Sequence, residues 1–356
     1  MTPIRHEGWA SLFFMLRLMK TVQLDNFTIY SIEYECYTSL CWRAQIHFLE
    51  AHLEQEQQFS NFDTIEDVQR AMFAQSYIAD RSLATAVLLA LKRRKPLLLE
   101  GEPGVGKTEI AKVLAAALDT QLIRLQCYEG IDINTAVYEW NYTRQMLHIR
   151  LMEAGGINRQ EELTEIFGPD FLMKRPLLQA IDASNAKTPV LLIDELDRSD
   201  EEFEAYLLEL LSDFQITIPE IGTVKAKEPP VVIITSNRTR EIHDALRRRC
   251  LYYWIDFPTL EKEYSIVLAR MPGVPEKLAK QVCYFVRELR SVDLYKAPGV
   301  AETLDWISSL LALNQLELVE GPVRDTLGAL LKYQDDVLKV GGNDLFKVVQ
   351  KARGAS

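Results

Sequence analysis

The chain has few of the residues that build disulfide frameworks and metal centres. Its 356 residues include five cysteines and five histidines. The cysteines are Cys36, Cys41, Cys127, Cys250 and Cys283. Neither set shows the paired short spacing of a zinc site or of a disulfide framework. The simple inference is a protein of the reducing cytoplasm, without a metal site built from these residues.

An excess of basic residues is also missing. Lysine and arginine together number 40, against 51 aspartates and glutamates, which gives a formal net charge of -11. Proteins that work on polynucleotides usually present a basic face to the phosphates. The charge balance therefore argues against nucleic acid as the main partner.

Long hydrophobic runs are absent from the start of the chain. Trp9 to Leu18 has the apolar character of a signal sequence, but Arg17 and Lys20 interrupt it and no small-residue cleavage site follows. The stretch is also too short to span a bilayer, so we expect no membrane insertion. Ser31 to Gln58 has the composition of a helix, but residues 1–60 show no chemistry, and we interpret them as an extension of unknown role.

What the chain does contain is a phosphate-loop motif. Gly-Glu-Pro-Gly-Val-Gly-Lys-Thr fits the pattern G-x-x-x-x-G-K-[ST] between an apolar run and an Ala-rich helical stretch. Its glycines let backbone N–H groups surround a polyphosphate at a helix N-terminus, where Lys107 adds a charge for the β- and γ-phosphates and Thr108 a hydroxyl for Mg²⁺. The candidate cofactor-binding residues here are Gly101, Glu102, Pro103, Gly104, Val105, Gly106, Lys107, Thr108 and Glu109.

Two further strand ends complete the candidate site. Val190 to Ile193 runs directly into Asp194 and Glu195, which, after a phosphate loop, predicts that Asp194 holds Mg²⁺ and Glu195 polarises the attacking water. Val231 to Thr235 ends close to Asn237, whose amide is placed to bind a hydrolytic water or the γ-phosphate. Asparagine is also a common turn former, so its assignment depends on the other two elements.

A run of three arginines precedes an aromatic strand. We interpret Arg247 as a solvated helix end that interacts with the helix dipole. At least one of the others is better explained as an arginine finger, supplied in trans to neutralise the γ-phosphate charge. We favour Arg249 for this role, followed by Arg248.

The remaining pattern predicts an α/β domain followed by a helical one. Strand candidates at residues 97–100, 122–126, 190–193, 231–235 and 252–255 alternate with helices, which implies a five-stranded parallel sheet covered on both faces, with ligand at its carboxyl ends. Helical periodicity then continues over residues 260–270, 275–289, 300–313 and 323–340. We expect a nucleotide-binding domain at residues 61–258 and a small helical lid at 259–356.

The order of these elements resembles that of AAA+ ATPases, and residues 61 to 350 are similar to the MoxR group. Within that group the chain looks most like the CoxD-type proteins. The strings that carry this resemblance are Tyr128–Asp132, Tyr138–Tyr142, Arg247–Cys250 and Pro298–Trp306. The resemblance implies a hexameric ring that binds ATP and Mg²⁺, hydrolyses ATP at subunit interfaces and remodels a client. It further implies a von Willebrand factor A domain partner and a metalloenzyme client of the molybdenum hydroxylase (carbon monoxide dehydrogenase) type.

The same resemblance assigns roles to several segments. It nominates Tyr77 and Ile78 for the adenine pocket, although a simple packed pair is an equal reading. The extra chain between Lys107 and Asp194 corresponds to the helix 2 insertion, in which we expect a short strand at Gln145–Arg150 and an exposed aromatic turn at Phe167–Pro176. Residues 214–223 correspond to the pre-sensor hairpin. Both features are expected either to contact the client or to be ordinary surface structure.

One departure from the AAA+ pattern concerns the lid. Ala301 and Glu302 lie where the sensor 2 arginine of other lids is expected. An alternative function, from a different class, is that of a regulatory or nucleic-acid-directed P-loop NTPase of the McrB-like type, which shares the insertion. The acidic balance and the lack of a recognisable DNA-reading domain favour the remodelling ATPase.

Overall fold

The computed structural model describes residues 19–24, 27–32, 62–155, 166–342 and 345–354. The chain divides into two compact units, residues 1–57 and 58–356. In the first unit, strands β1 (Met19–Leu24) and β2 (Phe27–Ile32) form an antiparallel pair. The helix expected from Ser31 is therefore wrong at its first two residues, because they belong to β2. The rest of that helix, the apolar stretch Trp9–Leu18, Cys36 and Cys41 lie outside the described residues.

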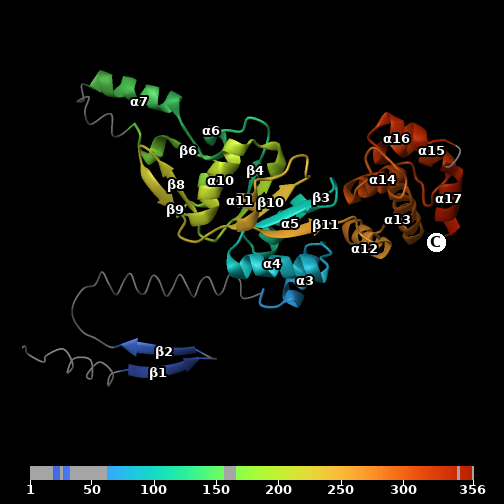
Figure 1. The fold of residues 1–356 in the computed structure, drawn as a ribbon, viewed down its shortest axis with the longest axis horizontal. Helices are drawn as coiled ribbons and strands as arrows, with labels where there is room; N and C mark the ends of the chain where they lie inside the picture. The colour runs from blue at the N-terminus through green and yellow to red at the C-terminus, as the bar shows by residue number, and fades with distance from the viewer. Residues whose placement is uncertain (1–18, 25–26, 33–61, 156–165, 343–344, 355–356) are drawn as a thin grey trace, which may run out of the picture. The chain divides into compact units, whose positions relative to one another are not determined.

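A five-stranded parallel sheet forms the centre of the second unit, as the sequence predicted (Figure 1). Its strand order is β11-β3-β10-β7-β4, and every neighbouring pair is parallel. The strands are β3 (Leu97–Gly101), β4 (Leu122–Gln126), β7 (Val190–Asp194), β10 (Val231–Ser236) and β11 (Leu251–Ile255). The three central strands are buried along their whole length, which explains their continuous apolar sequence.

Helices cover both faces of this sheet (Figure 1). Alternate side chains of β3 point to opposite faces, so that Leu97 and Leu99 join one core and Leu98 the other. The first core includes α3 (Ile65–Ala74), α4 (Arg81–Arg93) and α5 (Lys107–Ala117); the second includes α9 (Pro176–Ala180), α10 (Glu201–Asp213) and α11 (Asp244–Arg249). Thr64 caps α3 through a reciprocal pair of hydrogen bonds with Asp67, which fixes the start of that helix.

The insertion between β4 and β7 differs from its prediction. It contains α6 (Ile133–Ala136), β5 (Tyr138–Trp140), α7 (Tyr142–Gly155), a short 3₁₀ turn η1 (Pro169–Phe171) and β6 (Leu172–Lys174), with β5 and β6 paired antiparallel. The strand expected at Gln145–Arg150 is wrong: these residues lie inside α7, which begins where the Asn141 side chain accepts a hydrogen bond from the N–H of Arg144. The segment 167–176 is not simply an exposed turn either, because Phe171 is buried in the core.

The hairpin expected before β10 is confirmed. Strands β8 (Gln215–Ile218) and β9 (Gly222–Lys225) pair antiparallel. Between β7 and α10, residues Leu196–Arg198 form a 3₁₀ turn, η2.

Six helices follow β11 within the described residues and enclose a separate hydrophobic core. They are α12 (Leu260–Arg270), α13 (Glu276–Arg290), α14 (Val300–Ala312), α15 (Glu320–Leu330), α16 (Gln334–Val340) and α17 (Leu345–Gly354). The single helix expected over 323–340 is wrong, since Leu331 and Tyr333 are extended and separate α15 from α16. Among the described helices, none combines the length and the apolar character needed to cross a membrane.

Candidate functional site

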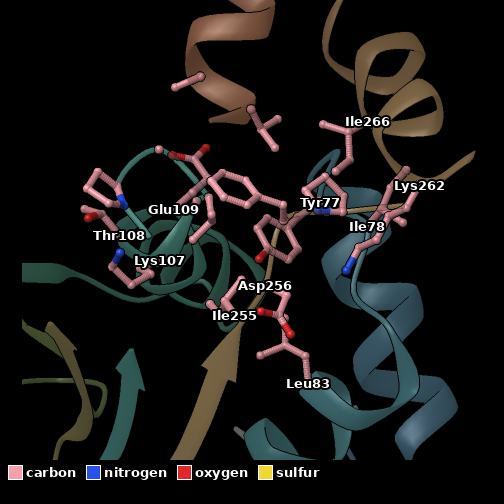
Figure 2. A pocket seen from close by; sticks show the side chains of 18 of the residues that line it. Tyr77, Ile78, Leu83, Lys107, Thr108, Glu109, Ile255, Asp256, Lys262 and Ile266 are labelled. Carbon is pink, nitrogen blue, oxygen red and sulfur yellow. The ribbon is translucent and has the colours of Figure 1, made fainter. Parts of the chain in front are cut away.

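A cavity of about 630 Å³ lies at the carboxyl ends of the central strands. Its walls come from the segment before α4, the loop between β3 and α5, the ends of β7, β10 and β11, and helices α12 and α14. Figure 2 shows the side chains that project into it. The predicted site residues that line it are Tyr77, Ile78, Pro103, Gly104, Val105, Gly106, Lys107, Thr108, Glu109, Asp194, Glu195 and Asn237.

The loop between β3 and α5 has the backbone that a phosphate cradle requires. Gly106 adopts φ +96° directly before the first residue of α5, a conformation that side chains rarely tolerate. Gly104 adopts φ +80°, and a Cβ there would come within 2.5 Å of the Glu302 carboxylate. The glycines are therefore needed both for the turn and for the close approach of α14.

Lys107 is the buried cation of this loop. Lys107 is only 7% exposed. Its Nζ donates hydrogen bonds to the backbone oxygens of Gly101 (2.7 Å) and Glu102 (2.8 Å). Burial lowers the pKa of Lys107 to about 8, because removal from water disfavours the charged form more than the nearby carboxylates favour it. An anionic phosphate would remove this electrostatic penalty.

Asp194 and Thr108 bring two side-chain oxygens together beside the phosphate loop. The Thr108 hydroxyl donates to Oδ1 of Asp194 at 2.9 Å, and the Thr235 hydroxyl donates to the same oxygen at 2.6 Å. Two hard oxygens side by side at a phosphate cradle fit Mg²⁺, which takes one or two protein ligands together with waters and substrate phosphates. Thr108 and Asp194 are the two residues predicted to hold Mg²⁺, and that role stays a prediction. The described residues contain no cluster of three or more His, Cys, Asp or Glu that could hold a metal ion.

A cation of the protein itself also contacts Asp194. Arg124, on β4, donates from Nε (3.0 Å) and from a terminal nitrogen (2.6 Å) to Oδ2. Asp194 is 2% exposed, so these two hydrogen bonds to one carboxylate oxygen compensate a buried charge. The sequence pattern did not indicate Arg124, although its position two residues before the end of an adjacent strand places it at the same edge.

Glu195 is held in an unusual backbone conformation. Its φ is +55°, in the left-handed region, and its N–H donates to the Thr235 hydroxyl at 2.9 Å. Oε2 accepts a hydrogen bond from Nε2 of Gln126 and lies 3.1 Å from Nε of Arg198. The carboxylate is thus positioned from both sides at the rim of the cavity.

Asn237 reaches the cavity from the end of β10. Its N–H donates to the buried carboxylate of Asp197 at 3.2 Å, and the hydroxyl of Thr239 donates to the other oxygen of that carboxylate at 2.6 Å. Asp197 therefore fixes the loop that carries Asn237, a function that the sequence pattern did not reveal.

Tyr77 and Ile78 line the cavity from the segment that precedes α4 (Figure 2). Burial raises the pKa of Tyr77 well above its usual range, and its ring lies close to Gly106. Their part in an adenine pocket stays a prediction.

Sequence reasoning missed three residues of α12 that line the same cavity. Lys262 pairs with Asp80 at 2.8 Å, Arg270 pairs with Glu109 at 2.7 Å, and Ile266 lies between them along the helix. Their spacing of four residues puts them on one helix face, which is the signal that would have found them. At α14, the N–H of Ala301 donates to the oxygen of Gly104 at 3.3 Å, so the lid contacts the phosphate loop here through its backbone.

The three arginines of α11 lie outside this cavity. Arg249 donates to the Ser212 hydroxyl (2.7 Å) and Arg248 pairs with Asp244 (2.9 Å), and both side chains are exposed. Arg247 lies in the last turn of α11, as expected, but its side chain is only partly solvated. Its guanidinium lies over the Tyr252 ring, 5.5 Å from the centroid, and 3.7 Å from the buried carboxylate of Glu100.

Three of the five thiols lie within the residues that the structure describes. Cys127, Cys250 and Cys283 are free, and burial raises the pKa of each to about 12. None of the three is a candidate for a reactive thiolate.

One family model matches the part of the chain that contains most of the candidate site. Residues 96–250 match the family model of the AAA domain of the dynein-related subfamily. The chain is 28% identical over 228 residues to a Lon protease of Cytophaga hutchinsonii, which covers 59% of the chain but only 24% of that protease. It is 23% identical over 253 residues to an uncharacterised protein of Staphylococcus haemolyticus, covering 69% of the chain and 87% of that protein.

Solved structures with similar folds include two ATPase-type proteins. The Thermotoga maritima RuvB Holliday junction branch migration motor is 18% identical, covering 78% of this chain and 72% of that one with a TM-score of 0.40. A candidate ATPase of C. hutchinsonii is 13% identical, covering 86% and 98% with a TM-score of 0.42. Together with the sheet order and the phosphate loop, the family match shows that the chain contains an AAA+ domain of the P-loop class.

Proposed function

We propose that the chain is an ATP-hydrolysing remodelling ATPase of the MoxR group and its CoxD-like subgroup. One observation carries this proposal. The phosphate loop, the paired oxygens of Thr108 and Asp194, the Glu195 carboxylate and the Asn237 loop all converge on one cavity covered by lid residues. This arrangement suits a nucleoside triphosphate with a hydrolytic water at the γ-phosphate.

Each protein group has a separate part in the proposed chemistry. Lys107 turns from its loop carbonyls to the β- and γ-phosphates, and Thr108 and Asp194 hold Mg²⁺. Magnesium, when bound, neutralises developing charge on the phosphates. Glu195 orients and polarises the attacking water, and Asn237 hydrogen-bonds that water or the γ-phosphate.

The proposed active form is a ring, which is needed for turnover but not for nucleotide binding. The exposed arginines of α11 support this part of the proposal. Arg249 and Arg248 lie on an exposed face and outside the cavity of their own chain, as a finger donated to a neighbouring subunit requires. We assign Arg249 this role, with Arg248 as the alternative, in a homo-oligomer that the resemblance indicates to be hexameric.

The proposed client is a metalloenzyme of the molybdenum hydroxylase type, acted on together with a von Willebrand factor A domain protein. The CoxD-like strings support this part of the proposal. Helix α7 supports client contact, since it exposes four large apolar side chains that cover none of the chain's own core: Tyr142, Met146, Leu147 and Leu151.

The trans arrangement is tested by mixing two inactive variants. Lys107→Ala subunits lose the phosphate-binding amine but keep the finger, whereas Arg249→Ala subunits keep the nucleotide pocket. Each variant alone should be inactive, and mixed rings should regain activity at interfaces that join an intact pocket to an intact finger. An arginine finger is worth about 10³- to 10⁵-fold in rate, so even a few such interfaces are measurable.

The mixture is assayed by phosphate release, with mixed rings verified by native mass spectrometry. Fluorescent-nucleotide titration provides the binding control: Arg249→Ala should bind ATP like the parent and Lys107→Ala should not. Mixed rings that stay as inactive as the separate variants would remove Arg249 from the trans role.

A further inference from the structure

Glu100 is a buried carboxylate that the proposed chemistry does not use. It is the fourth residue of β3, directly before the phosphate loop, and is 1% exposed. Its Oε2 has no hydrogen-bond partner within the described residues. A buried charge of this kind is strongly destabilising unless opposite charges compensate it.

Two guanidinium groups from different elements provide that compensation. Nε of Arg238 lies 3.9 Å from Oε2 of Glu100, and a terminal nitrogen of Arg247 lies 3.7 Å from the same atom. Arg238 directly follows Asn237, and Arg247 directly precedes the two candidate finger residues on α11. Glu100 therefore joins the start of the phosphate loop to the Asn237 loop and to the finger helix.

Aromatic rings of β11 fix the two arginines over the carboxylate. The guanidinium of Arg238 lies 5.7 Å from the centre of the Trp254 ring, and that of Arg247 lies 5.5 Å from the centre of the Tyr252 ring. Burial, and then the adjacent Glu100 carboxylate, raise the pKa of the Tyr252 hydroxyl. The five side chains form one cluster, which we call the Glu100 cluster.

The distances in the Glu100 cluster decide how it acts. At 3.7 and 3.9 Å the contacts are longer than hydrogen bonds, so the attraction is coulombic and depends on the positions of both arginines. Without the carboxylate, two guanidinium groups would face each other with no anion between them. Helix α11 has only six residues, so its orientation depends on such tertiary contacts.

We propose that Glu100 is a positioning residue for the arginine finger. It sets the orientation of α11, and with it the placement of Arg248 and Arg249 at the neighbouring subunit, relative to the phosphate loop and Asn237 of its own subunit. This inference rests on the proposed function, because it presupposes a finger that acts in trans.

The test uses Glu100→Gln, which keeps the side-chain shape but removes the charge. The variant should bind ATP with unchanged affinity, since its own nucleotide pocket is intact. Mixed with Lys107→Ala, it should regain activity as well as the Lys107→Ala and Arg249→Ala reference mixture does, because the neighbour supplies a correctly placed finger. Mixed with Arg249→Ala, it should remain roughly 10- to 100-fold below that reference, the typical effect of a misplaced reacting group.

This asymmetry separates positioning from a structural defect. Damage to the phosphate loop alone would reverse the asymmetry: the mixture with Lys107→Ala would stay low and the mixture with Arg249→Ala would reach the reference. An irrelevant carboxylate would raise both mixtures to the reference. Either result would overturn the inference. If the reference mixture itself stays inactive, Arg249 does not act in trans, and the positioning role of Glu100 is wrong as well. The reference mixture therefore tests the proposed function separately from the role of Glu100.

Two further variants secure the interpretation. Arg247→Lys keeps a positive charge but cannot reproduce the placement of the guanidinium, so it should show the same asymmetry. If the Glu100→Gln protein does not fold, Arg247→Lys is used in its place. Glu139→Gln is the matched control: Glu139 is a half-buried carboxylate paired with Arg175 in the insertion, and its loss should leave both mixtures at the reference level.

Discussion

At the scale of single residues, Lys107 links nucleotide affinity to pH. Its pKa in the folded protein is about 8, below the ordinary value of 10.5. Because the protonated amine is the form that binds phosphate, affinity for ATP should decline as the pH rises through about 8. The same shift implies that the free protein gains stability as the pH rises from about 8 towards 10.5, where only the unfolded chain still binds the proton.

Calorimetry measures this coupling directly. At a pH near 8, binding should take up about half a proton, detected as a difference in heat between buffers of unequal ionisation enthalpy. Lys107→Arg is the control, since a guanidinium stays protonated and should show no such uptake. Equal proton uptake by the two proteins would assign the titration to another group.

Glu195 is the second residue for which the geometry makes a specific prediction. Glu195→Gln should keep ATP and Mg²⁺ binding but lower turnover by roughly 10²- to 10⁴-fold, because an amide fills the same space without polarising water. Steady-state phosphate release and nucleotide titration measure the two effects separately. The exposed Glu202 provides a control, since Glu202→Gln should hydrolyse ATP at the parental rate. A Glu195→Gln rate within about twofold of the parent would exclude a catalytic role.

At the scale of elements, one buried ion pair joins three helices of the C-terminal region. Arg290 on α13 donates two hydrogen bonds, of 2.7 and 2.8 Å, to the carboxylate of Glu263 on α12. Thr303 on α14 donates to the same carboxylate at 2.8 Å. The carboxylate is fully enclosed, so its partners depend on it for charge and geometry.

Removal of one partner of the Glu263–Arg290 pair should lower the free energy of unfolding far more than removal of both. Glu263→Gln should lower the free energy of unfolding by about 3–5 kcal/mol, because it leaves the Arg290 charge buried and unpaired. The double change Glu263→Met with Arg290→Met should cost clearly less, since no uncompensated charge remains. Chemical denaturation of the two proteins checks this order, and equal losses would show that packing, not charge, dominates.

The elements that could be predicted were those with a strong local pattern. The three central strands of the sheet are mostly apolar runs, and α12 was predicted with its observed bounds, Leu260–Arg270. Helix α7 was missed because its apolar side chains do not pack on the core and so leave no clear helical stripe. The break between α15 and α16 contains neither glycine nor proline, so only tertiary packing, with Leu331 buried, places it.

The candidate site was predictable to the same extent. Carboxyl ends of parallel neighbours meet at one edge, so Lys107, Asp194 and Asn237 converge as the motif order indicates. The contributions of Lys262 and Arg270 depend on how the lid helices pack over that edge, which no local pattern specifies. The Glu100 cluster depends on the same kind of long-range placement.

At the scale of the whole second unit, two partly exposed ion pairs connect α12 to the α/β region. Lys262 pairs with Asp80 and Arg270 pairs with Glu109. Burial alone would raise the pKa of Asp80, but the Lys262 ammonium and the N–H of Leu83 hold it at about 2. Its contribution to stability is therefore complete above the ordinary pKa of 3.8 and is lost as the pH falls through about 2.

Loss of both pairs should loosen the lid without unfolding it. Lys262→Gln with Arg270→Gln should lower global stability by only about 1–2 kcal/mol, because each exposed pair is worth about 1 kcal/mol or less. Proteolytic cleavage of the 256–259 linker should nevertheless become faster. Limited proteolysis at low and high salt measures this, and salt should speed cleavage of the parent more than of the variant. Lys277→Gln, which removes an exposed pair with Glu317 inside the lid, is the control and should leave cleavage unchanged.

The backbone contact between Ala301 and Gly104 determines which substitutions the start of α14 can tolerate. An N–H that donates to a carbonyl oxygen is common to every residue except proline, so almost any substitution at position 301 preserves the donor. The absence of an arginine at this position therefore does not mean that the helical region and the phosphate loop make no contact. The contact is a main-chain hydrogen bond, so substitutions of the side chain at position 301 would neither indicate it nor remove it, unless they introduce proline.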